Sequence, residues 1–182
     1  MIKTNVLHNP NLVVLGFPFD RPRHEASFDA MDEADGDKPL EPVEPGLVYS
    51  KFESELAVRP DDIDMYQHVH SSRYMDYVLA ARFDQMERCY GMPMAEFQKL
   101  GYGWVIAATQ MHFRWPLLLG DKMTVRCWIE RFTSIGLRLK FEIDRLPEAK
   151  RSCDGWFDYV MISVETGRPA RIPEAIRRKY SI

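Results

Sequence analysis

The sequence predicts an α+β domain in which an antiparallel sheet of about five strands wraps around one long central helix. Three observations lead to this prediction. Residues 73–90 carry apolar side chains over a broad helical face. After Gly103 the apolar residues instead recur at about every second position, through roughly four segments. Finally, hydrophobic residues make up 46% of the 182 residues, which is ordinary for a soluble domain with its own core.

The first elements enclose a polar loop. Residues 52–58 can form a strand, and Arg59-Pro60-Asp61-Asp62 ends it, because proline cannot donate to a ladder and aspartates favour turns. Ser71 and Ser72 offer N-cap hydroxyls to the helix over residues 73–90, and Gly91 and Pro93 end that helix. The apolar set on this helix includes three aromatic residues that we expect in the core rather than in a ligand pocket: Tyr74, Tyr77 and Phe83. Tyr77 and its neighbours could also line both.

The remaining elements complete the sheet. A short second helix is predicted over residues 93–100. Residues 104–113 are largely apolar, as in a strand covered on both faces. Residues 122–132 and 136–146 alternate apolar with charged positions and are joined by a short turn, which predicts a hairpin. A last strand is predicted over about 152–164 and a helical turn over 173–180, so the element order gives an α+β layer.

Residues 1–49 read as an acidic, Pro-rich extension in front of a domain over residues 50–182. The first 50 residues hold 4 Lys/Arg against 9 Asp/Glu, which leaves residues 51–182 at a net charge of +2. The apolar run Asn11–Phe19 is expected to dock on the domain or on a second copy, since exposed apolar surface costs free energy.

Composition also bounds location and partners. The net charge of −3 gives no electrostatic reason to expect nucleic acid, and no window approaches the length of a membrane span. Three widely spaced cysteines predict reduced, packed thiols, and no signal peptide is recognisable. We therefore expect a cytoplasmic protein without nucleic-acid or membrane partners.

Reactive side chains concentrate in residues 61–72, between the first strand and the long helix. Free N–H groups and the dipole at a helix N-terminus can polarise a carbonyl, and a nearby carboxylate can act as nucleophile or general base. This arrangement predicts an acyl-transfer site. Asp62 and Asp64 could equally serve only as turn residues. A metal site formed by Asp62, Asp64, His68 and His70 is a weaker hypothesis, because the spacing matches no familiar site and we expect no metal.

Three stretches, taken in order, resemble one known family. They are Val58-Arg59-Pro60-Asp61-Asp62-Ile63-Asp64 with His68-Val69-His70-Ser71-Ser72-Arg73-Tyr74, then Phe113-Arg114-Trp115-Pro116 with Gly120-Asp121, then residues 166–173. They resemble hot-dog-fold acyl-CoA thioesterases of the hydroxybenzoyl-CoA thioesterase kind, in which a strand ends in D-x-D and H-V-N-N-x-x-Y opens the central helix. The first stretch is also similar to acyl-ACP thioesterases, which share D-x-D-x-x-Q-H-V. The likeness spans about residues 52–180.

The resemblance implies roles for residues of the loop. Asp64 falls on the catalytic carboxylate and His68 on a histidine thought to assist catalysis, although His68 could equally just pack the loop against the helix. The N–H groups around His70, Ser71 and Ser72 would polarise the thioester oxygen. The chain departs from the family where His70-Ser71 replaces Asn-Asn and where Gln67 replaces a frequent glycine.

Tyr66 and Arg114 are also expected to contact substrate. Tyr66 stands where the acyl-ACP branch has its catalytic asparagine, so that mechanism does not transfer intact. Arg114 and Arg138 could contact the phosphates of coenzyme A, or could simply be solvated strand arginines.

The resemblance implies an acyl-CoA thioesterase that releases a free acid and CoA. It implies no cofactor, because coenzyme A is part of the substrate. It further implies homodimers, often assembled into dimers of dimers, with the sites at the interface. Two alternatives stay open: hydrolysis of acyl groups carried on acyl carrier protein, and a hot-dog protein that binds acyl-CoA without turnover.

Overall fold

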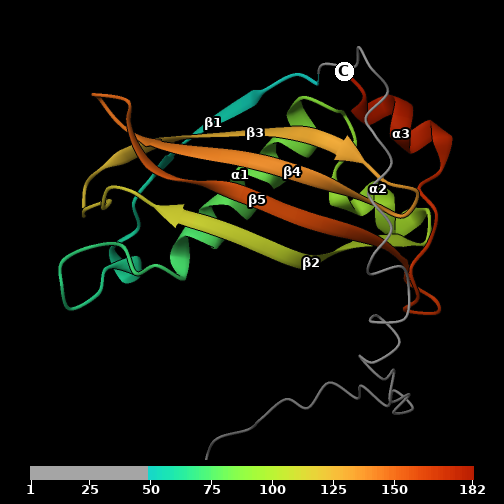
Figure 1. Ribbon diagram of the computed structural model, residues 1–182, viewed down its shortest axis with the longest axis horizontal. Helices are drawn as coiled ribbons and strands as arrows, with labels where there is room; N and C mark the ends of the chain where they lie inside the picture. Colours follow the sequence, from blue (N-terminus) through green and yellow to red (C-terminus); the bar gives the residue numbers. More distant parts are fainter. Residues whose placement is uncertain (1–48) are drawn as a thin grey trace, which may run out of the picture. The chain divides into compact units, whose positions relative to one another are not determined.

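The computed structural model describes residues 49–182, and these residues form the expected five-stranded antiparallel sheet with a long helix along one face (Figure 1). The strands lie in the order β1-β3-β4-β5-β2, and every neighbouring pair is antiparallel. Their bounds are Phe52–Ala57 for β1, Tyr102–Phe113 for β2, Lys122–Phe132 for β3, Gly136–Arg145 for β4 and Lys150–Ser163 for β5. The helices are α1 (Arg73–Arg88), α2 (Met94–Lys99) and α3 (Glu174–Tyr180), with a 3-10 turn at Pro60–Asp62. The α+β hot-dog prediction is confirmed.

The core lies between α1 and the face of the sheet that this helix covers. Alternate residues of β3 and β4 point inward and are buried, as the sequence pattern predicts: Met123, Val125, Cys127 and Ile129 on β3, and Leu137, Leu139, Phe141 and Ile143 on β4. Tyr74 and Tyr77 of α1 are buried with them, also as predicted. The prediction for Phe83 is wrong, because half of this side chain is exposed.

The start of α1 differs from its predicted capping. Ser72 occupies the N-cap position, but neither its hydroxyl nor that of Ser71 makes a capping bond. The backbone of Ser72 is already helical (φ −65°, ψ −21°), whereas a capping side chain needs an extended backbone. The Ser72 hydroxyl instead lies 2.9 Å from Nδ1 of His70. At the other end, Gly91 follows the helix at φ +56°, a left-handed conformation that suits glycine and explains why the helix stops there.

Strand β2 is not covered on both faces, which corrects the expectation for residues 104–113. Its first half is half-buried, but residues 107–110 are exposed. The topology explains the difference: β2 lies at one end of the strand order and pairs only with β5 among the described residues.

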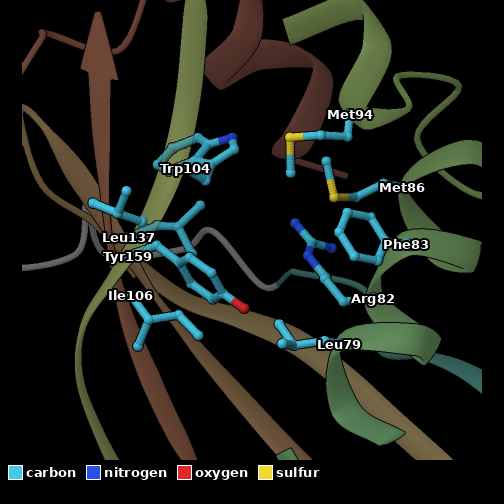
Figure 2. A pocket seen from close by; sticks show the side chains of 10 residues that line it. Leu79, Arg82, Phe83, Met86, Met94, Trp104, Ile106, Leu137 and Tyr159 are labelled. Carbon is cyan, nitrogen blue, oxygen red and sulfur yellow. The ribbon is translucent and has the colours of Figure 1, made fainter. Parts of the chain in front are cut away.

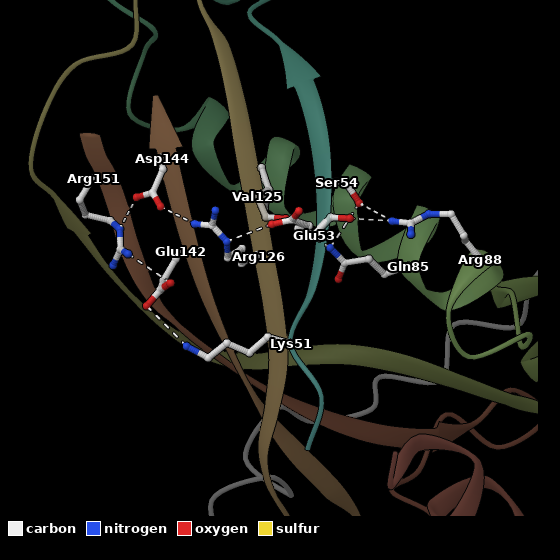
Figure 3. A network of polar contacts seen from close by, with 10 residues as sticks. All are labelled: Lys51, Glu53, Ser54, Gln85, Arg88, Val125, Arg126, Glu142, Asp144 and Arg151. Carbon is white, nitrogen blue, oxygen red and sulfur yellow. Dashed lines mark hydrogen bonds and ion pairs between the residues drawn. The ribbon is translucent and has the colours of Figure 1, made fainter. Parts of the chain in front are cut away.

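Charged side chains link the strands on the outer face of the sheet (Figure 3). Asp144 of β4 accepts hydrogen bonds from Arg126 of β3 and Arg151 of β5, and Glu142 pairs with Lys51 and Arg151. The pairs of Glu142 are partly exposed and contribute little individually, about 0–1 kcal/mol each, whereas Asp144 is only 5% exposed and pairs with two arginines. Together these pairs keep this face of the sheet polar.

Polar contacts also fix α1 to the edge strand β1. The Ser54 hydroxyl donates to Asp84 at 2.5 Å and accepts from the amide of the fully buried Gln85 at 3.3 Å. Arg88 donates to the Glu53 carbonyl at 2.6 Å. These bonds hold the second half of α1 in place over the sheet.

Residues 1–48 lie outside the described residues, so the extension over 1–49 and the docking of Asn11–Phe19 stay predictions. Within the described part, no helix is long and apolar enough to cross a membrane. Cys127 and Cys153 are buried and Cys89 is half-buried, all three as free thiols, in agreement with the prediction of packed cysteines.

Candidate active site at the N-terminus of α1

The loop of residues 58–72 is held by backbone hydrogen bonds at the start of α1. Val58 donates to the Asp121 carbonyl and Val69 to the Leu117 carbonyl, each at 2.9 Å. The Tyr74 hydroxyl accepts a bond from the Leu117 N–H at 3.2 Å, which ties the first turn of α1 to the segment after β2. In Figure 1 the loop therefore lies beyond the arrowhead of β2. The segment between β2 and β3 thus positions the loop, although the two are about 50 residues apart in the sequence.

Asp62 is the buried member of the D-x-D pair. Its Oδ2 accepts bonds from the Tyr77 hydroxyl at 2.6 Å and from Arg59 Nε at 2.7 Å, and Arg73 Nε lies 3.5 Å from Oδ1. Burial opposes ionisation, but the hydrogen bonds from Arg59 and Tyr77 hold the pKa of Asp62 below its usual value. Burial and the same bond raise the pKa of Tyr77 to about 12. Asp62 therefore anchors the loop and has little capacity left for chemistry.

Asp64 is partly exposed and only half engaged. Its Oδ1 accepts bonds from the N–H groups of Tyr66 at 2.8 Å and His68 at 3.4 Å. Within residues 49–182, Oδ2 accepts none. The turn passes through Gln67, whose backbone φ of +62° lies in the left-handed region. Glycine adopts this region without strain, which explains why the family that this loop resembles often has glycine here. Asp64 is thus a fixed carboxylate with one oxygen available.

The N–H groups predicted to polarise a carbonyl are not equivalent. The His70 N–H donates to the Asp62 carbonyl at 2.9 Å, and the Ser72 N–H lies 3.3 Å from His70 Nδ1. The Ser71 N–H has no acceptor among the described residues. It stands just before a helix of 16 residues, where the helix dipole favours negative charge. Of the three N–H groups predicted to polarise the thioester carbonyl, only that of Ser71 is therefore available among the described residues.

The other predicted residues surround this centre in different ways. Tyr66, His68 and His70 are exposed on the same loop as Asp64. Arg114 follows β2, where the ring of Phe113 packs edge-on against Tyr74 with centroids 5.2 Å apart. The structure thus brings all seven predicted residues to one end of α1.

Both arginines considered as phosphate contacts already have carboxylate partners. Arg114 pairs with both oxygens of Asp154, at 2.6 and 3.3 Å, and Arg138 pairs with both oxygens of Asp158, each at 2.6 Å. Neither guanidinium is therefore a free cation. In residues 49–182, no three His, Cys, Asp or Glu side chains lie in position to hold a metal ion.

A second feature is a cavity of about 350 Å³ between the helices and the sheet (Figure 2). Its lining comes from five elements: Leu79, Arg82, Phe83 and Met86 of α1, Met94 of α2, Trp104, Val105 and Ile106 of β2, Leu137 of β4 and Tyr159 of β5. None of these residues was predicted as a site residue. The sequence does contain an indication that Arg82 is unusual. It is a charged residue four positions after Val78, on a helix face that is otherwise apolar.

Arg82 is buried in this apolar lining with 8% of its surface exposed, and no carboxylate pairs with it among the described residues. Its guanidinium lies 5.0 and 5.2 Å from the ring centres of Tyr90 and Tyr180. Such contacts contribute about 0.5–2 kcal/mol each. Burying an ion costs several kcal/mol, so the rings offset the cost only in part.

The Tyr159 hydroxyl lies on the opposite wall of the cavity, turned toward the helix that carries Arg82 (Figure 2). It is buried and has no hydrogen-bond partner among the described residues. Burial raises the pKa of Tyr159 to about 12, against the opposing effect of Arg82. The cavity therefore combines apolar walls with two hydrogen-bond donors, the Arg82 guanidinium and the Tyr159 hydroxyl.

Comparisons with known proteins agree with this architecture. The family model of the thioesterase-like superfamily matches residues 58–180. The long-chain acyl-CoA thioesterase FadM of Escherichia coli strain K12 is 23% identical over 128 residues, which cover 70% of this chain and 96% of that protein. The chloroplastic acyl-acyl carrier protein thioesterase ATL3 of Arabidopsis thaliana is 28% identical over 141 residues, covering 74% of this chain and 70% of that protein.

A solved structure, the DHNA-CoA thioesterase from Staphylococcus aureus, superposes with a TM-score of 0.67 at 19% identity and covers 72% of this chain and 89% of its own. At that identity the likeness shows the fold. The family match, by contrast, spans more than half of the chain and includes the D-x-D loop, α1 and the whole sheet from β2 to β5. The chain therefore belongs to the thioesterase-like superfamily.

Proposed function

We propose that this protein hydrolyses acyl-CoA thioesters to a free acid and CoA, with Asp64 as the catalytic carboxylate. The observation that carries the proposal is the state of Asp64. One carboxylate oxygen is fixed by two backbone N–H groups, and the other is unengaged among the described residues beside the start of α1. Asp62, its neighbour in the motif, is buried and fully engaged, so it is a poor alternative.

The geometry supports a simple division of roles. The thioester carbonyl oxygen would accept the Ser71 N–H, where the helix dipole stabilises the negative charge that develops on it. The available oxygen of Asp64 would attack the carbonyl carbon or remove a proton from the attacking water. The carbon–sulfur bond then breaks, and CoA leaves as the thiol with a proton that comes from the water. If Asp64 attacks directly, water then hydrolyses the mixed anhydride formed on Asp64 and releases the free acid. The exposed side chains of Tyr66, His68 and His70 border this position.

The relatives support a thioester substrate and leave the carrier as the point to test. FadM is named for acyl-CoA and ATL3 for acyl carried on acyl carrier protein, at similar identities. Supplying the same acyl group on both carriers distinguishes the two. Higher kcat/KM on acyl-CoA is the expected result, and a clear preference for the protein carrier would replace the proposal by its acyl-ACP alternative.

Homodimerisation is part of the proposal. The long edge strand β2 has exposed residues and no described partner on its outer side, which supports pairing with a second copy. The three free thiols support the prediction of a cytoplasmic protein.

The test is a panel of short, medium, long and aromatic acyl-CoAs assayed for thiol release. Asp64→Asn keeps an oxygen to accept the Tyr66 and His68 N–H bonds but removes the negative charge. We expect it to fold like the wild type and to lose activity at least about 100-fold. Asp64→Ala should lose activity equally and also some thermal stability, because those two bonds are lost.

Asp61→Asn is the matched control, because Asp61 is an exposed carboxylate three residues away and should leave turnover unchanged. Full activity of Asp64→Asn would contradict the proposed role of Asp64. Tight binding of acyl-CoA without thiol release across the panel would replace the enzyme by the non-catalytic alternative.

A further inference from the structure

The cavity beside α1 contains a positive charge that the fold leaves uncompensated. Arg82 is more than nine-tenths buried, lines the cavity and pairs with no carboxylate among the described residues. Figure 2 shows its guanidinium directed from α1 into the space bounded by Trp104 and Tyr159. Two aromatic ring faces compensate part of the burial cost, as described above. A buried cation of this kind is expected to be paired when the protein carries out its function.

We propose that this cavity receives the acyl group of the substrate and that Arg82 binds a carboxylate at the end of that group remote from the thioester. The substrate class is then the mono-CoA thioesters of dicarboxylic acids. The inference rests on the proposed thioesterase function and specifies the acyl group on which that function acts.

The lining fits such an acyl group along its length. Apart from Arg82 and the Tyr159 hydroxyl, the walls are apolar, and they suit a chain of methylene groups or a ring. A carboxylate at the end of that chain could accept two parallel bonds from the guanidinium and a third from Tyr159. A methyl group in the same place would leave both donors buried and unpaired, which is unfavourable.

The position along the helix sets the range of chain lengths to test. Arg82 lies nine residues after Arg73, about 14 Å along the helix axis. A thioester at the start of α1 and a carboxylate at Arg82 are then separated by the length of a medium acyl chain. The phosphates of CoA are the alternative anionic partner for Arg82, and the binding measurement with free CoA below tests that alternative.

The experiment compares acyl-CoAs of equal length that differ only at the far end: octanoyl-CoA, 8-hydroxyoctanoyl-CoA and suberyl-CoA, with six- and ten-carbon sets beside them. We expect wild-type kcat/KM to be at least tenfold higher for the carboxyl-ended thioester than for the methyl-ended one at the best length. Arg82→Met replaces the cation with an unbranched apolar side chain and should shift this ratio at least tenfold toward the methyl-ended substrate.

Arg88→Met is the matched control, because Arg88 is an exposed arginine on the same helix and pairs with Asp84. It should leave the ratio unchanged. Tyr159→Phe removes one hydroxyl and should lower the carboxyl preference by a smaller factor, so it serves as a second test if Arg82→Met does not fold. A wild type that prefers the methyl-ended or hydroxyl-ended thioester, or an Arg82→Met protein with an unchanged ratio, would overturn the inference.

Binding measurements separate this inference from the proposed function. Calorimetric titration of the Asp64→Asn protein with thioether analogues of octanoyl-CoA and suberyl-CoA needs no turnover. Tighter binding of the carboxyl-ended analogue, lost in an additional Arg82→Met change, supports the inference even if no thioester is hydrolysed. Equal binding of both analogues contradicts it even if hydrolysis is found. Affinity for free CoA should be the same with and without Arg82→Met, and a loss of CoA binding would assign Arg82 to the carrier instead.

Discussion

Two carboxylates separated by one residue have different environments, and burial accounts for the difference. The side chain of Asp62 turns inward to Tyr77, Arg59 and Arg73, while that of Asp64 stays partly exposed and accepts bonds from its own loop. The residue pattern alone left both as turn residues or reactive groups. Their roles depend on contacts with α1, which are not encoded in the spacing of the motif.

Asp62→Asn should destabilise the protein without removing the catalytic carboxylate. The amide keeps an acceptor for Tyr77 but loses the charge that pairs with Arg59 and Arg73, so we expect a loss of about 1–2 kcal/mol at pH 7. The measurement is urea unfolding of the variant and the wild type, with Asp61→Asn as the control. An unchanged unfolding midpoint would show that Asp62 does not anchor the loop.

The difference in unfolding stability between the wild type and Asp62→Asn should disappear in acid. The pKa of Asp62 is lowered from 3.8 in the folded state, so its contribution is fully present above about pH 4. It is lost as pH falls through the folded-state pKa, where the wild type also becomes neutral at this position. Unfolding measured at a series of pH values from 7 downward should therefore show the gap between wild type and Asp62→Asn closing only below pH 4.

Ser71→Pro tests the proposed oxyanion donor, because proline lacks the N–H group. We expect kcat to fall about 100-fold or more, as for loss of one oxyanion-hole donor elsewhere. Ser71→Ala keeps the N–H and should retain near-normal kcat. Thermal melting of both variants checks that the loop still folds. Equal activity of the two variants would exclude the Ser71 N–H from catalysis.

For the individual strands, the spacing of apolar residues predicted which side chains are buried better than the apolar content of the segment did. The alternation in β3 and β4 correctly identified which side chains are buried, since every second residue of a strand points to the same face. The apolar run of β2 suggested burial on both faces, yet half of it is exposed. Whether a strand is central or at an edge depends on the order in which strands pair, which a single segment does not reveal.

Gly155 of β5 allows β2 and β5 to approach each other closely. A Cβ at Gly155 would lie 2.0 Å from the Gln110 carbonyl oxygen of β2 and 3.0 Å from the Phe141 ring. Gly155→Ala should therefore destabilise the domain by about 1–3 kcal/mol, as expected for overpacking. Gly103→Ala is the matched control, because its Cβ would meet neighbours only at 3.6 Å and beyond. Chemical unfolding of both variants gives the comparison, and equal stabilities would argue against a close approach at Gly155.

For the molecule as a whole, the sequence predicted the fold, the family and the loop that carries Asp64, because these depend on contiguous patterns. It did not predict the cavity, whose lining comes from five elements. Arg82 was visible as a charged residue on an apolar helix face. That Arg82 faces Tyr159 across the cavity depends on how α1 packs relative to β5, which is a matter of tertiary structure.

We expect the protein to form a dimer through β2. Among the described residues this 12-residue strand has no partner on its outer side, and an open edge of this length favours pairing with another strand. Phe113 of β2 is about half exposed, and so is Phe83 of α1, which lines the cavity together with Trp104 and Ile106 of β2. Two copies related by a two-fold axis would pair their β2 strands and cover these residues together.

Ala108→Lys places a positive charge on this edge. In a two-fold dimer, the lysine of one copy would then lie near the lysine of the other. We expect sedimentation to show a stable dimer or a dimer of dimers for the wild type at micromolar concentration and a shift toward monomer for the variant. Ile182→Lys, at an exposed apolar residue of the C-terminus, should leave the assembly unchanged. Because the cavity is lined by β2 and by the half-exposed Phe83, loss of the dimer should also lower kcat/KM. A wild type that sediments as a monomer at micromolar concentration would rule out this assembly and require a site complete within one chain.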